Sequence, residues 1–311
     1  MPQIWPIGGG KGGTGKSFIT GSLGIILAGE GYQTLLIDLD LGAANLHTTI
    51  GASNPGRSLS DFINKKVATL NETIVPTPTP NLFIISGAMN NLDIANLAHE
   101  QKMRIRREIA KLPYDYILLD LGAGTAFNTI DFFMISNFGI FITTPEPTAT
   151  ENIYRLIRSV YFRKIRQVLD VHHFRTLAKE AEEQNSKATV TNPDLLLGMI
   201  KKLDPEKGEM LEQELNTLEF GLVMNQHRNQ DNPNIGKFIC QIIQKHLALK
   251  IQFLGNIAFD ENVHLAVVNK RPFLFMSPYA RTATDLKECF KKLLTMKDKS
   301  SGIPYAVDQV L

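Results

Sequence analysis

A glycine-rich run near the N-terminus constrains this chain more than any other feature. Residues 8–17 read GGGKGGTGKS, and Gly10 to Ser17 fits the pattern G-x-x-x-x-G-K-[ST] of a phosphate-binding P-loop. Glycine removes Cβ atoms where backbone N–H groups must converge on phosphate oxygens. An apolar strand pattern precedes the run and a helical pattern follows it, so the positive end of the helix would face the anion. This spacing favours a nucleotide site over a glycine-rich turn that binds nothing.

The polar residues of the run have distinct expected roles. Lys16 reaches the β- and γ-phosphates, and the Ser17 hydroxyl is a candidate Mg²⁺ ligand. A second lysine, Lys11, would repel Lys16 unless an anion or a partner's site takes up its charge. The residues expected to contact the nucleotide here are Gly10, Gly12, Gly13, Thr14, Gly15, Lys16, Ser17 and Phe18.

Aspartates end two of the apolar runs that follow. The run from Thr34 ends in Asp38 and Asp40, which share one face of a strand because side chains alternate along it. The run from Tyr114 ends in Asp120, the Walker B pattern, in which the acid holds Mg²⁺ through water. Functional side chains project from the carboxyl ends of parallel strands, so all three acids are expected beside the P-loop. The alternative for the first pair is strand-end acids that hydrogen-bond to a neighbouring loop.

The pattern K-G-G-x-G-K-S, from Lys11 to Ser17, resembles the deviant Walker A ATPases, the class that includes MinD, ParA, FlhG (FleN) and the nitrogenase iron protein. The resemblance runs from about Ile4 to about Met296 and is closest to the MinD/FlhG branch. It implies an α/β fold: a doubly wound, mostly parallel sheet flanked by helices, as in other P-loop NTPases, with ATP and Mg²⁺ as ligands. The segments that favour this branch are residues 42–46, Asp120 to Gly124 and Thr144 to Ala149.

The resemblance also implies roles for single residues. Lys11 would reach across an ATP-dependent homodimer to the partner's phosphates, whereas a solvated loop lysine is the alternative. Asp40 would position the attacking water, and Asp38 would be its neighbour on the Mg²⁺ side. Asn225, at the end of the strand from Phe220, would read the adenine edge, unless it is only a capping residue. The resemblance thus makes Lys11, Lys16 and Asp40 catalytic and Ser17, Asp38 and Asp120 the Mg²⁺ residues.

The function implied is an ATP-binding and ATP-hydrolysing dimerisation switch that positions a flagellum, a division site or a similar cargo. The alternative is a ParA-like DNA-partitioning ATPase that binds non-specific DNA through a basic helix. Basic residues recur at helical spacing from Arg155 to Arg166. This face is either simply solvated or a patch for a protein partner, anionic lipid or DNA; a protein regulator is favoured because regulators dock near this helix in MinD-like proteins.

Composition and cysteine usage exclude other classes. The net charge of +2 does not by itself indicate nucleic acid. The two cysteines, Cys240 and Cys289, have no metal-ligand spacing, which argues against an iron–sulfur or metallochaperone ATPase. With no room for a signal peptide before the first strand and no apolar run near the ~20 residues of a membrane span, a cytoplasmic protein is expected. Residues 300–311 do not resemble MinD's basic amphipathic membrane helix, so membrane association is not supported.

The domain expected is a P-loop ATPase over residues 1–299 with a C-terminal tail over 300–311. Residues of about 172–215 depart from shorter family members and predict a helical insertion, with helices at 174–184, 193–203 and 205–215. Two departures from expectation stand out. Pro6 lies inside a central strand pattern, where a bulge would accommodate it, and Ala258 stands where family members often have proline.

Overall fold

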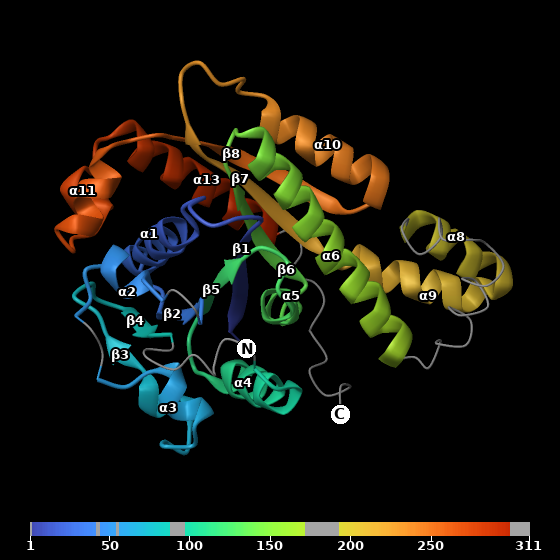
Figure 1. Cartoon of the computed structure of the whole chain (residues 1–311), viewed down its shortest axis with the longest axis horizontal. Coiled ribbons are helices and arrows are strands. Elements are labelled where there is room, and N and C mark those ends of the chain that lie inside the picture. Colours follow the sequence, from blue (N-terminus) through green and yellow to red (C-terminus); the bar gives the residue numbers. More distant parts are fainter. Residues whose placement is uncertain (1, 42–43, 54–55, 88–96, 172–192, 299–311) are drawn as a thin grey trace.

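The computed structural model describes residues 2–41, 44–53, 56–87, 97–171 and 193–298. Within these residues the strands form an eight-stranded sheet in the order β3-β4-β2-β5-β1-β6-β7-β8. Each strand pairs in parallel with its neighbours except β3, which is antiparallel to β4. The doubly wound α/β fold predicted from the sequence is confirmed (Figure 1). The strands are β1 Gln3–Gly9, β2 Thr34–Leu39, β3 Val75–Pro76, β4 Leu82–Ile85, β5 Tyr116–Ala123, β6 Phe138–Thr143, β7 Glu219–His227 and β8 Lys250–Ala258.

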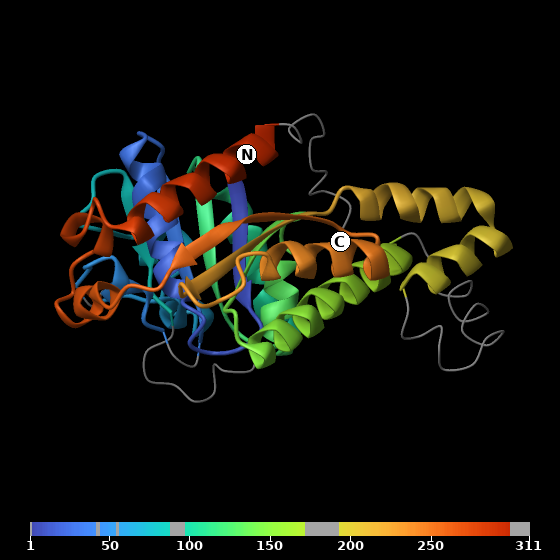
Figure 2. The same ribbon diagram turned by 90° about the horizontal axis from the view of Figure 1, so that it is seen from above.

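Helices cover both faces of the sheet, and Figure 2 shows α13 on the side opposite α6 and α10. One face packs against α1 (Lys16–Gly29) and α13 (Arg281–Asp298). The other packs against α4 (His99–Lys111), α5 (Phe127–Phe133), α6 (Pro147–Val171) and α10 (Ile235–Leu247). The shorter or peripheral helices are α2 Leu46–Thr49, α3 Leu59–Ile63, the 3₁₀ helix Leu70–Thr73, α8 Pro193–Leu203, α9 Pro205–Asn216, α11 Asn262–Val268 and α12 Phe273–Met276.

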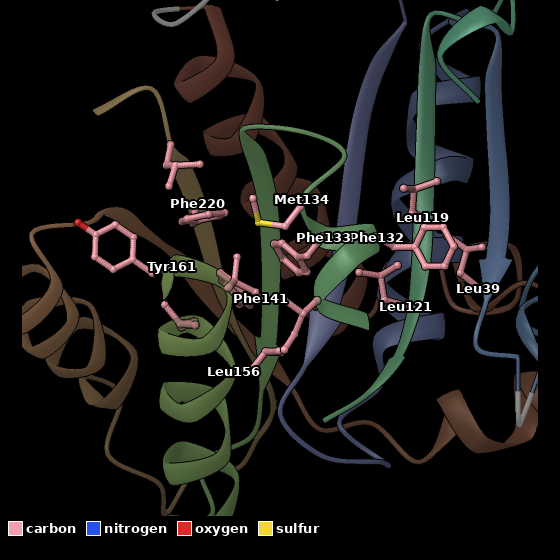
Figure 3. Close-up of a cluster of buried hydrophobic side chains, with 14 of the residues drawn as sticks. Leu39, Leu119, Leu121, Phe132, Phe133, Met134, Phe141, Leu156, Tyr161 and Phe220 are labelled. Carbon is pink, nitrogen blue, oxygen red and sulfur yellow. The ribbon is translucent and has the colours of Figure 1, made fainter. Parts of the chain in front are cut away.

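Phe133 packs α5 against the sheet beside β1, the strand that leads into the P-loop (Figure 3). Its ring stacks on Phe141 of β6 at 4.5 Å between centroids, and Phe141 lies 5.2 Å from Phe220 of β7. The ring occupies space left by two glycines: a Cβ at Gly8 or Gly139 would lie 2.7 or 2.2 Å from its atoms. Burial of each aromatic ring stabilises the fold by about 2–3 kcal/mol, so these glycines position α5 through packing.

Most predicted elements are present, with boundaries that differ by a few residues. The basic residues from Arg155 to Arg166 lie on a helix, α6, which begins at Pro147 inside the turn at 144–149, and α8 and α9 lie where helices were expected. The predicted helix at 174–184 and the tail at 300–311 lie outside the described residues. Sequence patterns did not identify β3, α2, α5, α10 and α12.

Pro6 is accommodated without a bulge of its own. It stands opposite Leu119 of β5, and β1 pairs with β6 only from Ile7 to Gly9. The irregularity in the β1–β5 register lies between Ile7 and Gly9. Pro6 therefore lies before the residues of β1 that pair with β6. Because of this position, its missing N–H removes no hydrogen bond between β1 and β6.

Among the described residues, no helix is long and apolar enough to cross a membrane.

Candidate nucleotide-binding site

The P-loop joins the end of β1 to the first residue of α1. Gly13 and Gly15 have φ angles of +77° and +85°, the left-handed region that favours glycine. A Cβ built on Gly12 or Gly13 meets no atom within 4 Å. The backbone of this part of the loop therefore faces open space and is accessible to a phosphate.

Three elements hold the rest of the loop in place. A Cβ at Gly10 would lie 2.4 Å from the backbone of Asn152 and Ile153, so α6 packs directly against the loop. The N–H of Gly124, after β5, donates to the carbonyl of Gly9 at 2.9 Å. A Cβ at Gly15 would lie 2.2 Å from Nδ2 of Asn225. Any side chain at Gly10 or Gly15 would force these neighbours apart.

Asn225 and Gln226, at the end of β7, bind the P-loop backbone. The side-chain nitrogen of Asn225 donates to the carbonyl of Thr14 at 2.9 Å, and that of Gln226 donates to the carbonyl of Gly13 at 2.8 Å. Asn225 is buried. The contact of Asn225 with adenine stays a prediction, and the structure adds a second role for this side chain. Gln226 was not singled out from the sequence, although a second amide directly after Asn225 was the available signal.

Asp120 lies buried at the base of the loop, beside the first turn of α1. The hydroxyl of Thr20 donates to its Oδ1 at 3.2 Å, and the side chain of Ser17 lies close enough to lower the pKa of this carboxylate. Burial raises the pKa of Asp120 to about 6, against the lowering effect of Ser17, Lys16 and Thr20. Its Oδ2 has no hydrogen-bond partner among the described residues.

This donor set fits a magnesium ion. Mg²⁺ in nucleotide sites prefers oxygen ligands from one or two side chains together with substrate phosphates. Ser17 supplies a hydroxyl and Asp120 a buried carboxylate oxygen without a protein partner, next to the loop expected to hold the phosphates. The structure thus brings together Ser17 and Asp120, two of the three residues that the sequence assigned to the metal.

Asp38 and Asp40 have different surroundings. Asp38 is fully buried, and its two carboxylate oxygens each accept a backbone N–H at 3.1 Å, one from Asp40 and one from Leu46. Burial, and then the nearby charge of Asp120, raises the pKa of Asp38. Asp40 is half-buried and lies beside Gly122, whose Cβ would be 3.5 Å from its Oδ1. Asp38 thus accepts hydrogen bonds from the backbone of the loop that follows β2, which agrees with the alternative stated for this pair of acids. The metal role of Asp38 and the water-positioning role of Asp40 stay predictions.

Further polar atoms lie at the same edge of the sheet. The hydroxyls of Ser86, Thr143 and Thr144, after β4 and at the end of β6, are buried and have no hydrogen-bond partner among the described residues. A buried hydroxyl without a partner costs free energy unless water or a ligand satisfies it. These residues were not predicted, although a hydroxyl residue directly after an apolar strand was a usable signal.

Lys11 and Phe18 turn away from the centre of the loop. The ammonium of Lys11 forms an ion pair with Glu146 and lies 3.5 Å from the hydroxyl of Thr148, both in the segment where α6 begins. The ring of Phe18 packs edge-to-face on Phe273 of α12 at 5.6 Å between centroids. The sequence predicted an anion or a partner's site for the charge of Lys11; in the single chain that anion is Glu146.

These features define a P-loop nucleotide-binding protein with its site at the carboxyl edge of a parallel sheet. Residues 6–273 match the model of the CobQ/CobB/MinD/ParA nucleotide binding domain, and the chain belongs to this family. The resemblance to MinD/ParA/FlhG-type ATPases is thereby confirmed.

Individual relatives agree with this assignment. A putative septum site-determining protein MinD of Guillardia theta is 31% identical over 193 residues, which cover 61% of this chain and 71% of the relative. The antiactivator FleN of Pseudomonas aeruginosa is 22% identical over 293 residues, covering 94% of this chain and 86% of FleN. The structure of MinD from Pyrococcus horikoshii complexed with Mg-ADP superposes with a TM-score of 0.65 at 20% identity, covering 97% of this chain and 100% of that one.

Proposed function

We propose that this chain is an Mg²⁺-dependent ATPase whose ATP-bound form dimerises and whose slow hydrolysis of ATP returns it to the monomer. The observation that carries this proposal is the position of Lys11. It belongs to the P-loop, yet its ammonium is turned outward onto Glu146, and its side chain is 32% exposed. A lysine placed in this way is available to a second molecule that approaches the nucleotide face.

The named ligands of similar structures support the choice of nucleotide. The Pyrococcus horikoshii MinD carries Mg-ADP, and a putative plasmid partition protein from Borrelia burgdorferi, with a TM-score of 0.58, carries AMPPNP. In this chain, the open backbone at Gly12 and Gly13 would bind the phosphates. Asn225 would hold the loop in place through its hydrogen bond to the carbonyl of Thr14. Mg²⁺, held by Ser17 and Asp120, would neutralise charge on the phosphates.

The chain's own residues would contribute positioning and charge, with no covalent intermediate. Lys16 would neutralise the β- and γ-phosphates in its own site. Lys11 would leave Glu146 and stabilise the transferring phosphoryl group in the partner's site, as a second cation does in other phosphoryl transfers. Asp40, which is half-buried beside Gly122, would orient the attacking water.

The output would be a surface that recruits partners only in the ATP state and so sets the position of a cellular structure. Relatives of this chain are named septum site-determining proteins and an antiactivator, and a similar solved structure is a MinC:MinD complex from Aquifex aeolicus. A division site, a flagellum or a similar cargo therefore fits the proposed switch, with a protein regulator as its partner.

Solution mass, measured by light scattering with Mg²⁺-ATP and with Mg²⁺-ADP, tests the proposal. We expect a dimer with ATP alone, its loss in Lys11→Ala, and its persistence in Asp40→Ala with ATP left uncleaved. Lys237→Ala, which removes an exposed lysine from α10, is the matched control and should behave as wild type. A monomer in every nucleotide state would refute the switch.

A further inference from the structure

Asp131 of the short helix α5 forms ion pairs with both neighbouring helices, α4 and α6 (Figure 1). Its Oδ2 accepts from Nζ of Lys102 in α4 at 2.5 Å. Its Oδ1 accepts from Nε and from a terminal nitrogen of Arg163 in α6, at 3.1 and 2.7 Å. The side chains of Asp131 and Lys102 are only 14% and 12% exposed, so water screens this pair weakly. One carboxylate therefore joins α5 to α4 and to α6.

A third cation, Arg106 of α4, lies close to the same carboxylate. Burial lowers the pKa of Arg106, the charge of Asp131 raises it and the charge of Arg163 lowers it, so the three groups are near enough to interact. The guanidinium of Arg106 also donates to the carbonyl of Met134, directly after α5, at 3.4 Å. Without the charge of Asp131, Lys102 and Arg106 would be half-buried cations that lack this compensation, which is unfavourable.

Thr129, two residues before Asp131, connects α5 to the carboxyl edge of the sheet. Its hydroxyl is buried and donates to the carbonyl of Gly122 at 3.3 Å. A Cβ on Gly122 would lie 3.5 Å from Oδ1 of Asp40, the residue proposed to orient the attacking water. The position of α5 therefore determines where the backbone at Gly122 lies relative to Asp40.

The segment between β5 and α5 also contacts the P-loop. Gly124 has a φ angle of +78°, and its N–H donates to the carbonyl of Gly9 at 2.9 Å. This segment is thus bound to α5 through Gly122 and to the P-loop through Gly124. Phe133 holds α5 on its sheet side, and the ion pairs of Asp131 hold it against α4 and α6.

We propose that Asp131 is a positioning residue for the cleavage of ATP. By holding α5 against α4 and α6 it fixes Gly122, and so the surroundings of Asp40 and of the water that Asp40 orients. This inference rests on the proposed ATPase function and extends it to a residue that touches neither nucleotide nor water. Cleavage depends steeply on the alignment of the attacking water, whereas the phosphates bind the P-loop backbone. Loss of Asp131 should therefore slow cleavage much more than it weakens ATP binding.

Phosphate release at several ATP concentrations tests this role. Asp131→Asn keeps the size of the side chain and removes its charge, and kcat should fall about tenfold while KM changes less than about twofold. Thr129→Val removes the hydroxyl bound to Gly122, leaves the ion pairs of Asp131 in place and should lower kcat similarly. The double variant should be no slower than the slower single variant, because both changes act through Gly122.

A control variant separates positioning from loss of stability. Phe138 is buried at the start of β6, at the opposite edge of the sheet, 5.5 Å from Trp5 between ring centroids. Phe138→Leu should lower stability in urea unfolding and leave kcat as in wild type. Effects of Asp131→Asn and Thr129→Val that multiply in the double variant would overturn the proposal. So would an equal loss of kcat in Phe138→Leu.

Hydrogen exchange of the protein without nucleotide supplies a measurement that does not depend on ATP cleavage. The amides of residues 121–126 should exchange about fivefold faster in Asp131→Asn and in Thr129→Val, and close to the wild-type rate in Phe138→Leu. Unchanged exchange in Asp131→Asn would refute the link from α5 to this segment. A wild type that releases no phosphate would refute the ATPase itself and the rate effect with it. If wild type and Asp131→Asn cleave ATP equally fast, only the positioning role is refuted.

Discussion

Lys11 of the P-loop forms an ion pair with Glu146, a residue 135 positions away in the sequence and directly before α6. The pair links the loop expected to hold the phosphates to the start of α6. Both side chains are partly exposed, at 32% and 59%. Exposed pairs contribute at most about 1 kcal/mol, so another anion can displace Glu146 readily.

Glu146→Gln should strengthen dimerisation with Mg²⁺-ATP, because Lys11 no longer leaves a carboxylate to reach the partner. The weak pair limits the gain to about fivefold in the dimer dissociation constant, measured by sedimentation at several protein concentrations. Glu151→Gln, which breaks the pair with Arg155 one turn further along α6, is the control and should change nothing. Weaker dimerisation in Glu146→Gln would mean that Glu146 binds the partner's Lys11 instead.

Asp120 should make the protein without nucleotide and metal less stable as the pH rises. Its pKa is raised from 3.8 to about 6 by burial, so the folded state holds the proton more tightly than the unfolded state. The stability contributed by this proton is present below pH 4 and is lost as the pH rises to about 6. At pH 7, Asp120→Asn should therefore be more stable than wild type by up to about 3 kcal/mol.

Urea unfolding of both proteins at pH 4.5 and pH 7 measures this difference, which should shrink at the lower pH. Asp38 is present in both proteins, but its pKa should be less raised in Asp120→Asn, because the charge of Asp120 is one of the causes that raise it. With Mg²⁺-ATP the order should reverse, because a bound ligand stabilises the protein that binds it more tightly. An equal stability of the two proteins at pH 7 without ligand would show that neighbouring groups already offset the cost of burying the charge of Asp120.

Asn225→Ala should loosen the P-loop rather than change only the choice of base. The side chain donates to the carbonyl of Thr14, and that bond is lost in the variant. Calorimetry should show about fivefold weaker binding of ATP, GTP and inorganic triphosphate alike, since a buried hydrogen bond contributes about 1 kcal/mol and its loss frees the loop. Gln226→Ala, which removes the more exposed bond to Gly13, should have a smaller effect. A change confined to the preference for ATP over GTP would point to adenine recognition alone.

Local sequence patterns predicted the segments that make up the site. They did not predict the contacts between segments that are far apart in the sequence. The P-loop, the apolar strands and Asp120 are each visible within a few residues of sequence. The bond from Asn225 to Thr14 joins residues 211 positions apart, and only the strand order brings them together. The short helix α5 owes its position to Phe133, which fills the space beside Gly8 and Gly139. Such a helix has too few turns to show a periodic pattern.

Ala258 occupies a position where the resemblance predicts proline, and its backbone explains the difference. The N–H of Ala258 donates to Oδ2 of Asp285 at 2.9 Å, and its carbonyl accepts from the hydroxyl of Thr282 at 3.0 Å, so the end of β8 is bound to α13 at both groups. Proline has no N–H and would leave the Asp285 carboxylate without this donor. Ala258→Pro should lower the free energy of unfolding by about 1–3 kcal/mol. Asp285→Asn, which keeps an acceptor oxygen, should cost less. Urea unfolding measures both, and an unchanged midpoint in Ala258→Pro would show that this bond does not hold β8 to α13.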